Sequence, residues 1–209
     1  MNEYQKMRYR KRGEILVKNL QKRHFDAYYC DTATDALSKA LELIPEGDCV
    51  SWGGAMSAQQ IGLLDAVRAG NYRTMDRDAY EDRNQAMREA LLCDSFISGA
   101  NALSLDGEMV NIDGQGNRVA AIVYGPRQVI VIAGMNKVMD TLEDAITRAR
   151  TVAAPTNQQR FQLDNPCTAT GTCADCLSKT CICNQILITR HCRPVGRIKF
   201  IVVGEDLGM

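Results

Sequence analysis

Polar residues with the chemistry to bind an anion recur between apolar segments of strand length in this chain. Arg118 can donate two parallel hydrogen bonds to a carboxylate or phosphate, and Lys137 can supply a compact positive charge. Because α/β proteins bind ligands at the ends of buried strands, we expect a site for a small anion there. The candidate ligand-binding residues, in chain order, are Gly53, Gly54, Ser57, Asn101, Asp106, Asn117, Arg118, Asn136 and Lys137.

Two glycines follow a short apolar segment, Cys49–Trp52, that reads as a strand. Ser57 and Gln60 are spaced as a capping box for a helix that starts directly afterwards. Backbone N–H groups at such a strand-to-helix turn can surround an anion, and glycine leaves room for its approach. A tight turn without a ligand explains Gly53 and Gly54 equally well.

The asparagine and aspartate candidates also have a simpler explanation. Asn and Asp side chains bond their own backbone and are common in turns, which could account for Asn101, Asp106 and Asn117. Arg118 precedes an apolar segment that we read as a strand, and a turn does not explain it. We therefore expect Arg118 to bind a ligand or to form a buried ion pair.

A second group of chemically capable residues lies late in the chain, where six of the nine cysteines fall between residues 167 and 192. Thiolates are good ligands for zinc and for iron–sulfur clusters, and Cys173 and Cys176 have the C-x-x-C spacing of a chelating turn. Free or redox-responsive thiols and a disulfide framework are the alternatives. The candidate metal ligands are Cys167, Cys173, Cys176, Cys181 and Cys183.

The composition is that of a soluble globular protein. Across 209 residues, 45% are hydrophobic and 24% charged, and the formal net charge is zero, which argues against non-specific binding to nucleic acid. The charged N-terminus lacks the apolar segment of a secretory signal, and no apolar run is long enough to span a bilayer. We expect a cytoplasmic protein without membrane insertion, in which the thiols stay reduced unless a metal holds them.

Hydrophobic periodicity indicates the fold. Residues 1–25 read as an amphipathic helix that lies across the main domain or contacts a partner. Strands and helices then alternate up to about residue 98, and several strands with short turns follow. This order predicts a three-layer α/β/α domain with a mixed sheet over residues 26–209, with a cysteine-rich insertion at 164–192.

Several spaced motifs resemble the LUD-domain family of bacterial lactate-utilisation proteins. They are A-N-A at Ala100, V-N-x-D-G-x-G-N-R-V-A-A at Val110, G-x-N-K at Gly134 and A-A-P ending at Pro155. The later P-C-T-x-T-G-x-C-x-D-C and the closing V-G-E-D-L-G are similar to a cysteine-bearing branch related to lactate-utilisation protein C.

The resemblance implies a fold like that of ribose-phosphate isomerases and coenzyme A transferases, and a role in the utilisation of lactate-type 2-hydroxy acids. It implies an accessory or electron-transfer-linked component, with iron–sulfur oxidoreductase subunits, a small anionic metabolite and a second copy of the chain as candidate partners. The alternatives are a stand-alone enzyme acting on a phosphosugar or coenzyme A ester, and a metal-stabilised regulatory or assembly protein. No activated nucleophile or catalytic carboxylate pair is recognisable, so the sequence assigns no catalytic residue.

Overall fold

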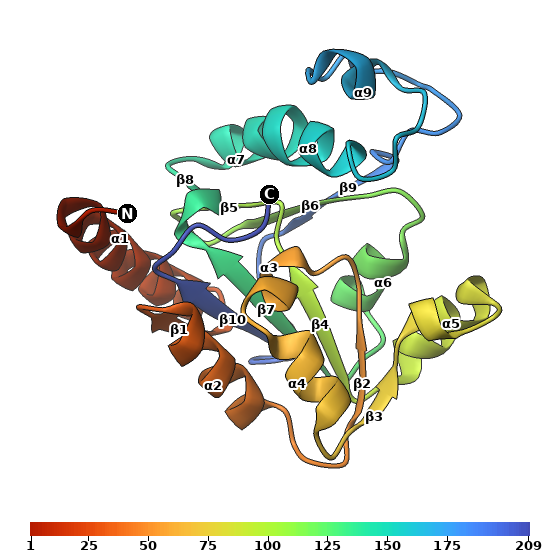
Figure 1. Ribbon diagram of the computed structural model, residues 1–209. Coiled ribbons are helices and arrows are strands. Elements are labelled where there is room, and N and C mark those ends of the chain that lie inside the picture. The colour runs from red at the N-terminus through yellow and green to blue at the C-terminus, as the bar shows by residue number, and fades with distance from the viewer.

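The computed structural model describes residues 1–209 and is centred on a six-stranded sheet (Figure 1). All of its neighbouring strands run parallel, in the order β1-β10-β7-β4-β2-β3. Parallel strands need crossover connections, and the chain supplies them mainly with helices. The strands are β1 (Asp26–Cys30), β2 (Cys49–Trp52), β3 (Arg73–Met75), β4 (Ser95–Gly99), β7 (Gln128–Gly134) and β10 (Ile198–Val203).

Helices cover both faces of this sheet. Helices α1 (Glu3–Lys22) and α6 (Asn117–Val123) pack on one face, and α2 (Ala33–Leu43), α3 (Met56–Gln60) and α4 (Leu63–Ala69) pack on the other. Strand β7 shows why, because successive side chains point to opposite faces of a sheet. Its Val129, Val131 and Ala133 join the first core, whereas Ile130 and Ile132 join the second. The predicted three-layer α/β/α arrangement is confirmed.

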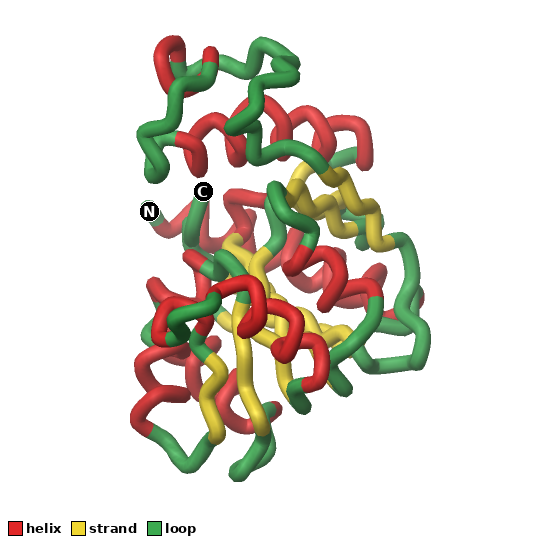
Figure 2. Tube along the Cα trace, turned by 90° about the vertical axis from the view of Figure 1, so that its right-hand side faces the viewer, coloured by secondary structure: helices red, strands yellow, loops and turns green.

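The strand-rich half of the sequence forms a separate four-stranded mixed sheet, in the order β8-β5-β6-β9. Its strands are β5 (Ala102–Ser104), β6 (Met109–Asp113), β8 (Val138–Met139) and β9 (Gln185–Thr189). Helices α7 (Leu142–Arg148) and α8 (Ala154–Gln158), joined by a π-helical turn, cover one face with small residues such as Ala145 and Ala149. Figure 2 shows this helical segment crossing above the strands of the second sheet.

The N-terminal helix packs on the main domain. It begins with a capping box formed by Asn2 and Gln5, and it buries Leu16 and Leu20 against the central sheet. Arg12 forms an ion pair with Asp140 at 2.5 Å, which connects α1 to the turn between β8 and α7. None of the helices combines the length and the apolar character needed to cross a membrane.

Two short irregular segments complete the chain. Between β3 and β4 the chain forms a 3-10 turn (Arg77–Ala79), helix α5 (Arg83–Glu89) and a second 3-10 turn (Ala90–Leu92). Asp82 separates them by accepting hydrogen bonds from the first amides of α5. The cysteine-rich segment contains helix α9 (Pro166–Thr170) and is otherwise loop up to β9.

The predicted strand after Arg118 is wrong, because residues 117–123 form helix α6. Apolar residues there are too few to separate a short buried helix from a strand by pattern alone. The side chain of Asp113 stabilises the helix by accepting hydrogen bonds from the amides of Arg118 and Val119, at 3.0 and 3.1 Å. Arg118 therefore projects from the first turn of a helix.

The predicted Ser57 cap is also wrong. Helix α3 begins one residue earlier, at Met56, and its N-cap residue Ala55 makes no side-chain hydrogen bond. The Ser57 hydroxyl instead accepts a hydrogen bond from the Lys137 ammonium at 3.0 Å. A residue that we assigned to helix capping is thus part of a contact between α3 and the 3-10 turn (Met135–Lys137) that follows β7.

Candidate functional site

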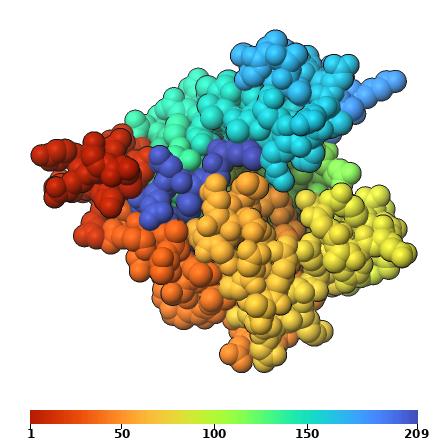
Figure 3. Space-filling model, in the orientation of Figure 1, coloured from red at the N-terminus to blue at the C-terminus, as the bar shows by residue number.

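A cavity of about 610 Å³ opens where four parallel strands end. Gly54 follows β2, Gly99 ends β4, Lys137 follows β7 and Met209 follows β10, and all four residues line it. In the space-filling view, the dark-blue C-terminal segment lies between the teal helices over the second sheet and the orange helices of the first half (Figure 3). The cavity has the volume typical of small-molecule sites and the location where α/β sheets bind ligands.

Six of the nine predicted ligand-binding residues line this single cavity. They are distant in sequence, and the parallel topology brings them together because consecutive crossover connections return each strand in the same direction. These six are Gly54, Ser57, Asn101, Asn117, Arg118 and Lys137.

Gly53 does not line the cavity but packs against the side chain of Arg118, which does. A Cβ atom at this position would lie 3.0 Å from Cγ and Cδ of Arg118, which is closer than side chains normally approach. The glycine therefore leaves room for the Arg118 stem to pass into the cavity. By contrast, a Cβ atom at Gly54 would meet no atom within 4 Å, so Gly54 faces open space.

The two remaining candidates lie outside the cavity. Asp106 is in the turn between β5 and β6, where its carbonyl accepts a hydrogen bond from Arg23 Nε at 2.7 Å. Asn136 uses its side-chain oxygen to accept a hydrogen bond from the Leu207 amide at 3.1 Å, and its carbonyl accepts one from Arg148. Asp106 thus joins α1 to the second sheet, and Asn136 fixes the C-terminal segment.

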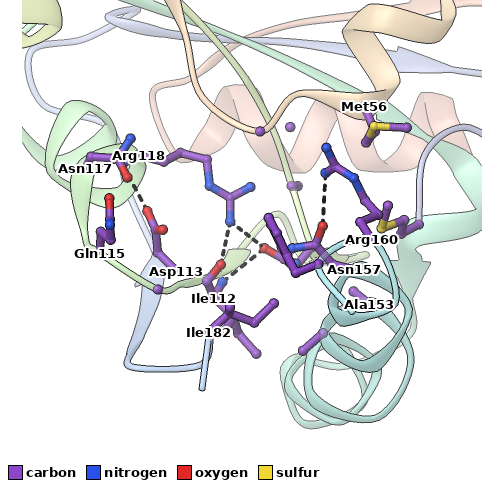
Figure 4. A pocket seen from close by; sticks show the side chains of 18 of the residues that line it. Met56, Ile112, Asp113, Gln115, Asn117, Arg118, Ala153, Asn157, Arg160 and Ile182 are labelled. Atoms are coloured by element: carbon purple, nitrogen blue, oxygen red, sulfur yellow. Dashed lines mark hydrogen bonds between the residues drawn. The ribbon is translucent and has the colours of Figure 1, made fainter. Parts of the chain in front are cut away.

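Arg118 projects into the middle of the cavity (Figure 4). Its Nη2 atom donates to the Asn101 side-chain oxygen at 3.0 Å and to the Ile112 carbonyl at 2.5 Å. The other two donor atoms of the guanidinium, Nε and Nη1, make no hydrogen bond and no ion pair. Burial lowers the pKa of Arg118, but an arginine remains charged in proteins, so the cavity presents an incompletely paired cation.

Asp113 determines which groups remain free to bind an anion. Its carboxylate accepts hydrogen bonds from two backbone amides at the start of α6. Those amides are consequently not available to a ligand. An anion near α6 would therefore be bound by side chains such as Arg118 rather than by these amides.

Lys137 is a second cation without a carboxylate partner. Only 4% of the residue is exposed, and its sole hydrogen bond is the one to Ser57. Burial, reinforced by the charges of Arg148 and then Arg118, lowers the pKa of Lys137 to about 7. A substantial fraction of the Lys137 side chains is therefore neutral at physiological pH.

The C-terminal segment closes the space above Lys137. Gly208 has a positive φ of 68°, and a Cβ atom there would lie 2.7 Å from both Lys137 Nζ and Ser57 Oγ. The Gly208 amide donates to the Gln60 side chain at 2.6 Å. A side chain at position 208 would displace the amine or the Ser57 hydroxyl, so the C-terminal segment lies directly against both groups.

Further cations line the cavity that the sequence did not single out. Arg77 and Arg83 come from the segment between β3 and β4, and Arg160 follows α8. Asp78 and Asp113 are the carboxylates among the lining side chains. Four guanidinium groups and Lys137 thus outnumber two carboxylates, which makes the cavity electropositive.

The five candidate thiols line a second, smaller cavity of about 130 Å³. Ile112, Ala154 and Ile182 line both cavities, so the two share a wall. No group of three or more Cys, His, Asp or Glu side chains lies close enough together to hold a metal ion. The cavity-lining cysteines are Cys167, Cys173, Cys176, Cys181 and Cys183.

Together, the fold and the cavity define a three-layer α/β domain with an electropositive, ligand-sized site at the carboxyl ends of its parallel strands. The LUD domain family model matches residues 13–203, and the chain belongs to this family. The predicted family is therefore confirmed, and that family is associated in general with lactate utilisation.

Solved structures are similar to this chain at low sequence identity. A DUF162 family protein from Deinococcus radiodurans aligns over 95% of this chain and 97% of its own, with a TM-score of 0.53 and 9% identity. Ribose 5-phosphate isomerase A from Methanocaldococcus jannaschii aligns over 53% of this chain and 55% of its own, with a TM-score of 0.35 and 15% identity. Among curated proteins, no relative matches.

Proposed function

We propose that this LUD-domain protein serves the utilisation of lactate-type 2-hydroxy acids by binding a small carboxylate in the electropositive cavity. The ligand is the 2-hydroxy acid or the 2-oxo acid formed from it. The protein acts as an accessory or electron-transfer-linked component of that oxidation.

The observation that carries this proposal is that two basic side chains without a carboxylate partner, Arg118 and Lys137, line one cavity. Burying a charge without a partner is costly, and proteins retain such charges chiefly where a ligand or a reaction requires them. Arg118 and Lys137 line the same cavity, and neither forms an ion pair with a carboxylate. A bound carboxylate would supply the missing negative charge and would accept from the free Nε and Nη1 atoms of Arg118.

Thermal unfolding in the presence of a ligand panel tests the proposal. We expect lactate and pyruvate to raise the midpoint of unfolding, because a ligand that binds only the folded state stabilises it by mass action. Lactamide, which has the same size as lactate but carries no charge, is the matched control and should have no effect.

The other members of the panel distinguish the alternatives. Stabilisation by a phosphosugar or by coenzyme A, with no response to lactate or pyruvate, would favour a stand-alone enzyme. Equal stabilisation by lactate and lactamide would contradict recognition of the carboxylate. An absence of response to every anion would contradict an anion site in this cavity.

We further propose that the five thiols of the second cavity bind a thiophilic metal, either zinc or the iron of an iron–sulfur cluster. Soft thiolate donors suit both, and five of them facing one cavity exceed the four that either centre needs. Because no three of them are gathered at metal-binding distance, the loops of this segment must close around the metal when it binds. The wall shared with the larger cavity supports a role near the bound acid.

Elemental analysis of anaerobically purified protein tests the thiol proposal. We expect about one zinc per chain, or iron with acid-labile sulfide, and loss of that metal in the Cys173→Ser/Cys176→Ser variant. The matched control is Cys30→Ser, which removes a buried thiol at the end of β1, outside the thiol cavity. Protein that contains no metal and takes none up on reconstitution would refute the site.

A further inference from the structure

We infer that Lys137 is a nucleophilic amine that forms an imine with the carbonyl carbon of a 2-oxo acid held in the cavity. This inference rests on the proposed function, because it takes the carboxylate bound by Arg118 as given. It adds a covalent activity that anion binding alone does not require.

Lys137 is the one lysine that the fold buries. The chain's other lysines lie on the surface or beside acceptors, as Lys39 does with Glu42 and Lys199 with Asp26. An amine that served only to attract anions could remain protonated at the surface. Burial beside Arg148, without a carboxylate, instead favours the neutral form, in agreement with a pKa of about 7.

The geometry suits a 2-oxo acid in particular. The carbonyl carbon of such an acid is bonded directly to its carboxylate, so the group that binds the anion and the group that attacks must lie in one cavity. Arg118 and Lys137 both line it, and the charge of Arg118 affects the pKa of Lys137. A neutral lysine in a desolvated pocket is the form that attacks carbonyl groups.

The reaction is balanced without an oxidant or reductant. The nitrogen lone pair of Lys137 forms a bond to the carbonyl carbon, and the π electrons of the carbonyl move to oxygen. One N–H proton moves to that oxygen, giving a carbinolamine. The C–O bond then breaks, and the hydroxyl leaves as water with the second N–H proton.

Ser57 is placed to move these protons. Its hydroxyl oxygen lies 3.0 Å from Lys137 Nζ and accepts a hydrogen bond from it, and its position at the start of α3 is fixed by the fold. A hydroxyl can accept and donate at once, so it can pass a proton from the nitrogen to the departing oxygen. The C-terminal segment around Gly208 covers Lys137, of which only 4% is exposed, and this burial limits the access of the water that would hydrolyse the imine.

Reduction with borohydride in the presence of pyruvate tests this inference. We expect a covalent adduct with the mass of pyruvate less one oxygen, and peptide mapping should place it on Lys137. The Lys137→Arg variant should form no adduct, whereas Lys18→Arg, which changes an exposed lysine of α1, should form as much as the wild type. Lactate has no ketone carbonyl, so it should form no adduct and should protect the wild type against pyruvate.

Each outcome is informative even if Lys137→Arg folds poorly, because mapping and protection by lactate use the wild-type protein. Pyruvate that raises the unfolding midpoint but leaves no adduct on Lys137 would overturn the imine and leave the anion site standing. Adducts spread over surface lysines, without protection by lactate, would also overturn it. If neither pyruvate nor lactate stabilises the protein and pyruvate leaves no adduct, the proposed function itself would be overturned.

Discussion

Replacing Arg118 with glutamine should weaken the binding of lactate or pyruvate by about tenfold to a hundredfold, because a charged hydrogen bond contributes roughly 1.5–3 kcal/mol and each 1.4 kcal/mol is tenfold in affinity. The free Nε and Nη1 atoms of Arg118 are the donors that a carboxylate would use, and glutamine offers neither their charge nor their fork. Isothermal titration calorimetry at fixed ionic strength measures the change. Arg118→Lys keeps the charge but not the forked pair of donors, so its affinity should lie between those of the wild type and Arg118→Gln.

The matched control is Arg160→Gln. Arg160 also lines the cavity, but it is exposed and its Nη1 donates to the Asn157 side chain at 3.1 Å (Figure 4). Solvent and salt screen an exposed charge, so this change should cost little affinity. An Arg118→Gln protein that melts like the wild type and binds lactate equally well would refute our assignment of the anion-binding group. A larger loss of affinity in Arg160→Gln than in Arg118→Gln would also refute it.

The architecture was predictable because its strands are buried on both faces. The apolar run from Val129 to Gly134 predicts a central strand, and β7 occupies the middle of the sheet with both faces covered. The separation of the strand-rich half into a second sheet was not predictable. Strand pairing depends on long-range contacts such as Asp113 with Gln185, and local periodicity does not encode them.

The site was predictable in part, for a related reason. Strand-end groups such as Lys137 could be recognised because parallel topology must bring the ends of strands together. Arg77 and Arg160 lie in polar segments where an arginine is ordinary, and only the tertiary fold turns them toward the cavity. Asp113 lies within a motif that we recognised, but it accepts hydrogen bonds from the first-turn amides of α6, a helix that we read as a strand.

The local role of glycine was likewise beyond the sequence. The sequence suggested that Gly53 and Gly54 both surround an anion with backbone amides, but the fold gives the two residues different roles. Gly54 lines the cavity, while Gly53 lies against the stem of Arg118. The side chain that packs against a glycine can come from a distant part of the chain. Here it comes from α6, which follows β3, β4, β5 and β6.

Replacing Lys137 with methionine should stabilise the folded protein at pH 7, by on the order of 3 kcal/mol in the free energy of unfolding. The reason is the cost of protonating a buried amine. In the folded state the pKa of Lys137 is about 7, whereas an unfolded chain restores the ordinary lysine value, so the unfolded state binds the proton more tightly. Methionine fills a similar volume without that penalty, and urea unfolding followed by circular dichroism measures the difference.

The stability difference between wild type and Lys137→Met should depend on pH in a defined direction. Between the folded and the unfolded pKa of Lys137 the unfolded state carries the extra proton, so the wild type should gain stability as pH rises from about 7 toward 10. Other groups titrate in this range, but they do so in both proteins, and the difference between wild type and Lys137→Met isolates Lys137. The advantage of the variant should therefore be largest at pH 7 and below, and nearly absent at pH 10.

Lys199→Met, which removes a lysine paired with Asp26, should show no such gain. A constant difference between wild type and Lys137→Met across this range would mean that the amine is protonated in the folded state, and the imine chemistry would lose its nucleophile.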